Sequence, residues 1–118
     1  MEFIETSTAP LPLGHYSQAT VINECIYVAG QLPLDAKDTQ RQFNTPEEQT
    51  RQTLRNLEQV VIAGGGRKNT IAKVTLYIAD IALWPQINAE YAIFFWDHKP
   101  ARTAVPVPAL PKGVLIEI

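Results

Sequence analysis

The chain has 118 residues, of which 46% are hydrophobic and 19% are charged, a balance that is typical of a folded domain and argues against a disordered chain. A formal net charge of −2 offers no basic excess to neutralise phosphates, so nucleic-acid binding has no electrostatic support. This length suits one hydrophobic core, and we expect residues 1–118 to form a single domain.

Three short strands are expected before the first helix. Residues 2–6 form the first, and residues 18–23 and 25–30 form a pair around a turn at Asn23 and Glu24. A polar connection over residues 31–44 follows.

The clearest element in the sequence is a helix that begins after Thr45. Thr45-Pro46-Glu47-Glu48 is a capping box with proline at the first helical position. A run of three glycines, Gly64 to Gly66, ends the helix. Between these signals, apolar residues recur at helical spacing at Leu54, Leu57 and Val61.

The second half of the chain predicts a strand, a helix and two further strands. Val74, Leu76 and Ile78 alternate with polar residues, as in a half-buried strand. The helix is expected from about Pro85 to Asp97, and strands are expected over residues 102–108 and 114–118.

This order of elements predicts an α+β fold in which two helices cover one face of a mixed β-sheet. The sequence supplies no third helix for the other face of the sheet. We therefore expect that face to be buried by oligomerisation.

Few residues are available for redox or metal chemistry. Cys25 is the only cysteine, with no histidine or cation evident beside it, so we interpret it as a small apolar strand residue and not a nucleophile. The two histidines and Cys25 are too scattered for a zinc site, and no metal is expected. A single cysteine, the lack of a signal-peptide pattern and the lack of an apolar run of about 20 residues predict a cytoplasmic protein with no membrane span.

Two charged residues lie in otherwise apolar strands. Arg102 begins one strand, and its guanidinium can bind a carboxylate through two parallel hydrogen bonds. Spacing alone favours an internal salt bridge or a solvated strand end over this binding role. Glu117 lies between Ile116 and Ile118, so it is either an exposed strand residue or a functional acid.

Six short motifs occur in order along the chain, and together they resemble the Rid family, also called the YjgF family, of reactive-intermediate deaminases. They are Gly14-His15-Tyr16-Ser17-Gln18-Ala19, Val28-Ala29-Gly30-Gln31-Leu32-Pro33, Asn88-Ala89-Glu90-Tyr91 with Phe94-Phe95, Ala101-Arg102-Thr103, Leu110-Pro111-Lys112 and Ile116-Glu117-Ile118. The resemblance covers nearly the whole chain. It implies a fold similar to chorismate mutase and a homotrimer whose sheets pack into a central barrel, with sites in the clefts between subunits.

The resemblance also implies a hydrolase that needs no cofactor. Its substrates would be small 2-imino or enamino acids, such as 2-iminopropanoate and 2-iminobutanoate, and its products 2-keto acids and ammonia. Arg102 matches the carboxylate-binding arginine of the family, and Glu117 matches the acid that positions water. Tyr16, Gly30 and Asn88 match other substrate-binding positions.

Two departures from the family pattern leave other functions open. Ala29, in the same substrate-binding stretch, replaces the serine of many deaminating members, and His15 replaces the usual proline. The missing hydroxyl is compatible with a non-catalytic trimer that binds small carboxylates such as 2-ketobutyrate. An RNA-acting translation inhibitor, a description attached to parts of this family, is disfavoured because no basic, aromatic-interleaved patch is present.

Overall fold

The structure is a computed structural model that describes residues 1–118. It contains six strands and two helices in the order that the sequence predicts. Their bounds are β1 Glu2–Ile4, β2 Ala19–Ile22, β3 Cys25–Val28, α1 Pro46–Ala63, β4 Lys73–Ile78, α2 Trp84–Phe95, β5 Ala101–Pro106 and β6 Ile116–Glu117.

The strands form a mixed sheet in two three-stranded parts, with the orders β1-β2-β3 and β5-β4-β6. Only β4 and β5 pair in parallel. The two parts join at Gln31 and Ile118, whose backbones exchange hydrogen bonds of 2.7 and 3.0 Å. Because β5 lies at the edge of the sheet, Pro106 removes no hydrogen bond from an inner strand.

Helix α1 begins and ends where the sequence predicts. The side-chain oxygen of Thr45 accepts a hydrogen bond of 3.1 Å from the backbone N–H of Glu48, and Glu48 in turn accepts from the N–H of Asn44. The helix ends at Ala63, before Gly64. Its apolar face is buried at Leu54, Leu57, Val60 and Val61.

Helix α2 is shorter at its carboxyl end than the sequence predicts. It runs over Trp84–Phe95, whereas the apolar pattern suggested Pro85 to Asp97. Trp96 adopts a left-handed backbone with φ of 51°, which turns the chain away from the helix axis before Asp97.

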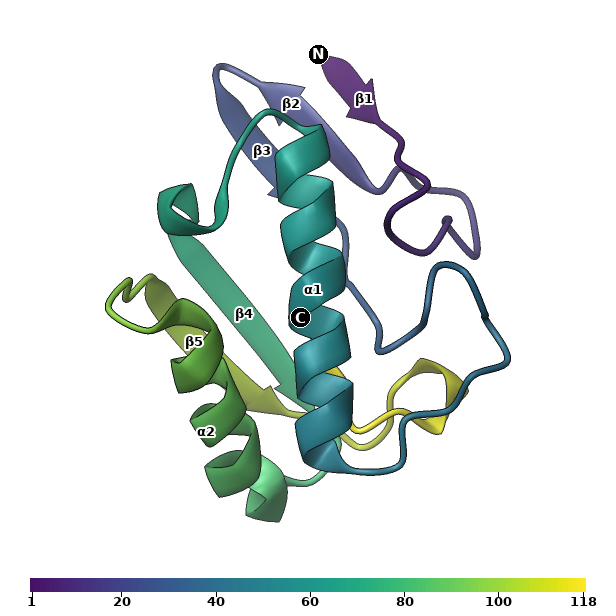
Figure 1. Ribbon diagram of the computed structural model, residues 1–118, viewed down its shortest axis with the longest axis vertical. Helices are drawn as coiled ribbons and strands as arrows, with labels where there is room; N and C mark the ends of the chain where they lie inside the picture. Colours follow the sequence, from purple (N-terminus) through teal and green to yellow (C-terminus); the bar gives the residue numbers. More distant parts are fainter.

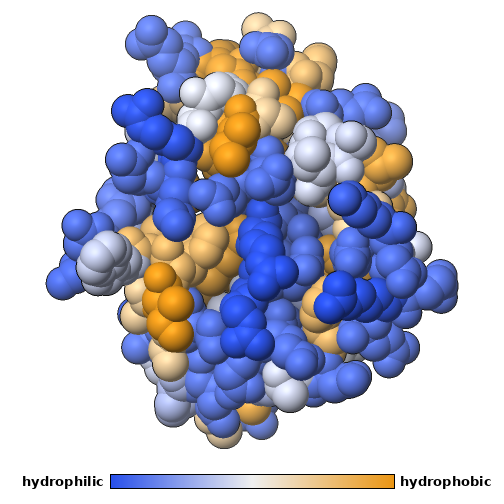
Figure 2. Space-filling model, in the orientation of Figure 1, coloured by the Kyte–Doolittle hydropathy of each residue, from blue (hydrophilic) through white to orange (hydrophobic).

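Both helices lie on the same face of the sheet, as Figure 1 shows, and this prediction is confirmed. The face of the molecule that carries α1 is mostly hydrophilic at its surface (Figure 2). No element covers the opposite face of the sheet, where Phe3, Ile22, Tyr27 and Tyr77 remain between 40% and 66% exposed. Neither helix is long and apolar enough to cross a lipid bilayer.

Two buried polar side chains hold the loops beside the sheet. The amide nitrogen of Gln18 donates to the carbonyls of Thr6, Ala9 and Pro10, which fixes the loop before β2. The amide nitrogen of Asn56, on α1, donates to the carbonyls of residues 32 and 34 and so fixes the loop after β3. These bonds satisfy backbone oxygens that would otherwise be buried without partners.

Candidate functional site

Arg102 lies against helix α2. Its Nη1 donates a hydrogen bond of 2.7 Å to Oδ1 of Asn88. Its guanidinium carbon lies 4.7 Å from the ring centre of Trp84 and 4.8 Å from that of Tyr91. We call these four residues the arginine group.

The spacing of α2 explains how the arginine group forms. Trp84, Asn88 and Tyr91 stand at positions i, i+4 and i+7, so they share one face of the helix. Arg102 reaches this face because it pairs with Val74 of β4, whose side chain is buried on the helix side of the sheet. The guanidinium is exposed and makes one side-chain hydrogen bond, so most of its five donors are free to bind a carboxylate.

Glu117 lies beside Gly30 at the join between the two parts of the sheet. A side chain at Gly30 would overlap the carboxylate of Glu117, so only glycine allows this close approach. Glu117 is half-buried, and burial raises the pKa of its carboxyl above the ordinary value of 4.5. No positive charge or hydrogen-bond donor acts in the opposite direction.

Tyr16 and Gly30 line the same small hollow on the protein surface. The hydroxyl oxygen of Tyr16 accepts a hydrogen bond of 3.1 Å from the backbone N–H of Leu13, which leaves the hydroxyl proton free to be donated. We call Tyr16, Gly30 and Glu117 the glutamate group. Ala29 adjoins this group, but its backbone is engaged within the protein by Gln18 and Gln31.

The two groups lie on opposite faces of the sheet. Arg102 shares a face with Val74, whereas Glu117 pairs with Tyr77 and shares the face of Tyr77. Val74 and Tyr77 are three residues apart in one strand, so their side chains point to opposite sides. Of the predicted site residues, the fold therefore brings Arg102 to Asn88, Tyr16 to Gly30, and Gly30 to Glu117, without joining the two sets in one chain.

Trp84 was not among the site residues predicted from the sequence, and Tyr91 was named only as part of a family motif. The helical spacing of the two aromatic residues around Asn88 was the available signal. Cys25 is exposed on the uncovered face of the sheet. Histidine, cysteine, aspartate and glutamate side chains do not gather anywhere in a group of three that could hold a metal ion.

Comparison with known proteins identifies the family. The family model described as endoribonuclease L-PSP matches residues 6–118. The chain is 43% identical to a RutC family protein of Pyrococcus horikoshii, over 99% of this chain and 93% of that protein. It is 39% identical to the 2-iminobutanoate/2-iminopropanoate deaminase of Rattus norvegicus, over 98% of this chain and 84% of that protein.

Solved structures agree with this assignment. The structure of Escherichia coli TdcF with bound serine superposes with a TM-score of 0.95 at 32% identity, covering 99% of this chain and 94% of TdcF. The YjgF gene product of E. coli gives a TM-score of 0.94 at 34% identity, covering 99% of this chain and 94% of that one. The predicted α+β fold is therefore confirmed, and the chain belongs to the endoribonuclease L-PSP family, which includes the RutC and Rid proteins.

Proposed function

We propose that this protein hydrolyses small 2-imino acids, such as 2-iminopropanoate and 2-iminobutanoate, to 2-keto acids and ammonia. The observation that carries the proposal is the arginine group. A guanidinium held by α2 with most of its donors free fits the carboxylate that these substrates share. Relatives named as 2-iminobutanoate/2-iminopropanoate deaminases, at 36% to 39% identity, support the same reaction.

The reaction needs only modest catalysis by the protein, because an iminium carbon is already electrophilic. Arg102 fixes the substrate carboxylate, which orients the imine carbon toward a water held by Glu117. Glu117 takes a proton from this water as its oxygen bonds to the imine carbon. The carboxyl then returns this proton to the nitrogen. As the carbon–nitrogen bond breaks and ammonia leaves, the carboxylate takes the proton of the new hydroxyl group, so that the keto group forms, and Glu117 then passes this proton to solvent. A carboxyl whose pKa is raised above 4.5 by burial is better suited to both transfers than an ordinary glutamate.

The active unit that we propose is a homotrimer with its sites in the clefts between subunits. Two observations support it. The uncovered face of the sheet exposes Phe3, Tyr27 and Tyr77, apolar surface that a partner would bury. Arg102 and Glu117 also lie on opposite faces of their own sheet, so a cleft with both needs Glu117 of the partner subunit.

The reaction is tested with imines made in situ. An amino-acid oxidase acting on alanine or 2-aminobutyrate releases the imino acid, and semicarbazide traps what remains. The protein is expected to lower the rate of semicarbazone formation in proportion to its concentration. If the wild-type protein and Arg102→Met lower it equally, the proposed function is wrong.

A non-catalytic binder of small carboxylates is the second candidate, and Ala29 favours it, because no hydroxyl is present there to assist the reaction. Calorimetric binding of 2-ketobutyrate without any turnover of imine would identify this function. RNA cleavage, which the name of the family model suggests, lacks a basic surface in a chain of net charge −2.

A further inference from the structure

We propose that Trp84 is a positioning residue for Arg102 and that its indole senses whether a carboxylate is bound there. The inference rests on the proposed carboxylate-binding role of Arg102. Trp84 was not among the predicted site residues, and the proposal gives it the role of holding the Arg102 guanidinium in position.

Arg102 makes two kinds of contact with α2: a hydrogen bond from one guanidinium nitrogen, and contacts between the guanidinium and two aromatic rings. Asn88 holds one nitrogen by a hydrogen bond of 2.7 Å. Trp84 and Tyr91 are seven residues apart, about 10.5 Å along a helix, and the guanidinium carbon is 4.7 and 4.8 Å from their rings. The guanidinium therefore contacts both rings while one of its nitrogens is bonded to Asn88.

This arrangement limits how the guanidinium moves. A positive group over an aromatic face is attracted by the electron density of the ring. With two aromatic rings in contact and Asn88 at one nitrogen, the group is held before a ligand arrives. A carboxylate then binds in the guanidinium plane at a smaller entropic cost than it would to a freely rotating arginine.

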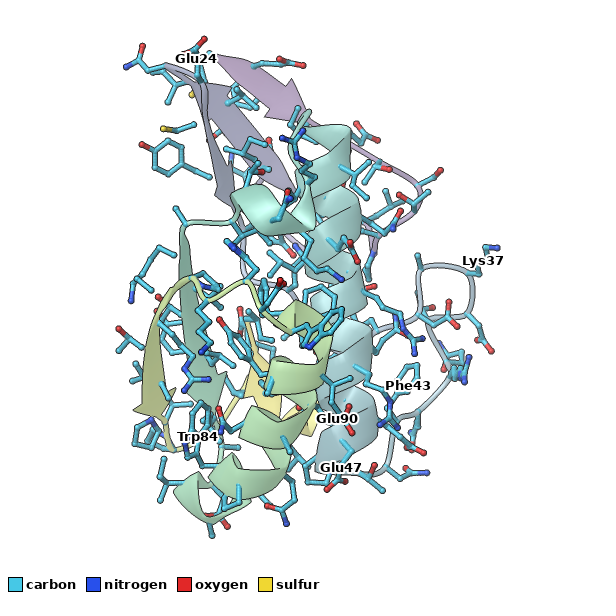
Figure 3. The ribbon with its side chains drawn as sticks, turned by 60° about the vertical axis from the view of Figure 1, so that its left-hand side comes forward. Glu24, Lys37, Phe43, Glu47, Trp84 and Glu90 are labelled. Carbon is cyan, nitrogen blue, oxygen red and sulfur yellow. The ribbon has the colours of Figure 1, made fainter.

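Trp84 is the ring that can be changed with least damage to the core. Tyr91 is 6% exposed and packs against Phe95 at a ring separation of 4.6 Å, whereas Trp84 is half-buried at the start of α2. Figure 3 shows Trp84 on the side of α2 that faces β5, the strand that carries Arg102.

The same helix provides a matched control. The side-chain nitrogen of Lys68 lies 4.7 Å from the ring centre of Phe94, the same separation as between Arg102 and Trp84. Phe94, like Trp84, is a partly buried residue that packs against the core. Phe94→Leu therefore removes an equivalent cation–ring contact that has no part in the site.

The first experiment is spectroscopic. The chain has two tryptophans, and Trp96 is 85% exposed beyond the end of α2. In a Trp96→Phe variant, Trp84 is the only indole, and titration with 2-ketobutyrate should change its emission with a saturable dependence. The same titration in Trp96→Phe combined with Arg102→Met should give no saturable change.

The second experiment separates binding from chemistry. Trp84→Leu should raise KM for the imino acid by about fivefold and leave kcat within about twofold. The lost cation–π contact holds Arg102 in place for binding the substrate carboxylate and does not touch the reacting atoms. Trp84→Phe, which keeps an aromatic face, should recover most of the wild-type KM. Phe94→Leu should lower stability without changing KM.

The outcomes distinguish this inference from the proposed reaction. Binding of 2-ketobutyrate that alters Trp84 emission without any imine turnover removes the reaction and keeps the inference. Turnover with a wild-type KM in Trp84→Leu, or a KM in Trp84→Phe as high as in Trp84→Leu, removes the inference and keeps the reaction. If the folded wild-type protein binds no 2-keto acid at millimolar concentration, the inference is wrong as well.

Discussion

Arg102 and Glu117 are held by the same strand, β4, yet their side chains lie on opposite faces of the sheet. Arg102 pairs with Val74 and Glu117 with Tyr77, and this odd spacing sets the two faces. In a single chain, the residue proposed to bind the carboxylate and the residue proposed to position water therefore do not meet.

Arg102→Met is expected to lower kcat/KM for imino-acid hydrolysis by about 10- to 150-fold, the range for losing hydrogen bonds to a charged group. Arg51→Met is the control, since Arg51 also donates to α2, through a bond of 2.7 Å to Glu90 between the two helices (Figure 3). Arg51→Met should stay within about twofold of wild type, because Arg51 bonds to Glu90, which is not part of the arginine group. Equal losses in the two variants would mean that Arg102 acts through general surface charge.

Glu117→Gln is expected to change the pH dependence of stability. Because burial raises the pKa of Glu117 in the folded state above 4.5, the fold binds its proton more tightly than the unfolded chain does. This stabilisation is present below pH 4.5 and is lost as the pH rises through the folded pKa. Glutamine has no carboxyl proton to lose, so its side chain stays neutral at every pH in this range. The urea midpoints of the variant should therefore fall less than those of wild type between pH 4.5 and 7.

The same variant should lose activity while it gains stability at neutral pH. An amide cannot take a proton from water, so the turnover rate is expected to fall by about 100-fold or more. The wild-type rate should rise with pH through the pKa of Glu117, and the remaining rate in Glu117→Gln should not. Parallel pH profiles in the two proteins would exclude Glu117 as the base.

Local signals in the sequence predicted the elements well. Thr45 with Pro46 and the glycines after Ala63 set both ends of α1, because capping depends on neighbouring residues alone. The predicted carboxyl end of α2 was wrong because Trp96 adopts a backbone conformation with positive φ, which residues other than glycine rarely take.

The arrangement of the site could not be predicted from spacing. The faces of Arg102 and Glu117 depend on how two distant strands each pair with β4, and a shift of one residue would reverse either face. The roles of Gln18 and Asn56 were also beyond sequence reasoning, since their partners are backbone carbonyls at least eight residues away in the chain. The family motifs predicted which residues to examine. The pairing register of β5 and β6 with β4, which the sequence does not reveal, places Arg102 and Glu117 on opposite faces.

Gly30→Ala is expected to abolish most activity without unfolding the protein. The new methyl group would overlap the Glu117 carboxylate, which can swing away because it is the flexible end of a side chain. Glu117, the acid that we propose positions water, is then displaced while the core stays intact. Gly14→Ala is the control, because its methyl group would lie 3.8 Å from the nearest atom, in the ring of Tyr16. Circular dichroism should be unchanged in both, and only Gly30→Ala should lower kcat.

Tyr91→Phe is expected to leave stability unchanged or raise it by up to about 1 kcal/mol, as measured by urea unfolding. The hydroxyl of Tyr91 is buried and has no hydrogen-bond partner, so the native state gains nothing from it. The aromatic face toward Arg102 is kept, so KM should also be unchanged. A marked rise in KM would show that the substrate or a bound water uses this hydroxyl.

Mixed oligomers test whether the two groups meet across subunits. Arg102→Met subunits retain Glu117, and Glu117→Gln subunits retain Arg102. When they are unfolded together in equal amounts and refolded, about one quarter of the clefts in a cyclic trimer should receive both intact residues. Activity should then return to about one quarter of the wild-type level, although each parent alone is nearly inactive. Parents that are mixed without subunit exchange should stay inactive. If refolded mixtures never exceed the sum of the parents, Arg102 and the partner's Glu117 do not share a cleft, and each residue must act within its own chain.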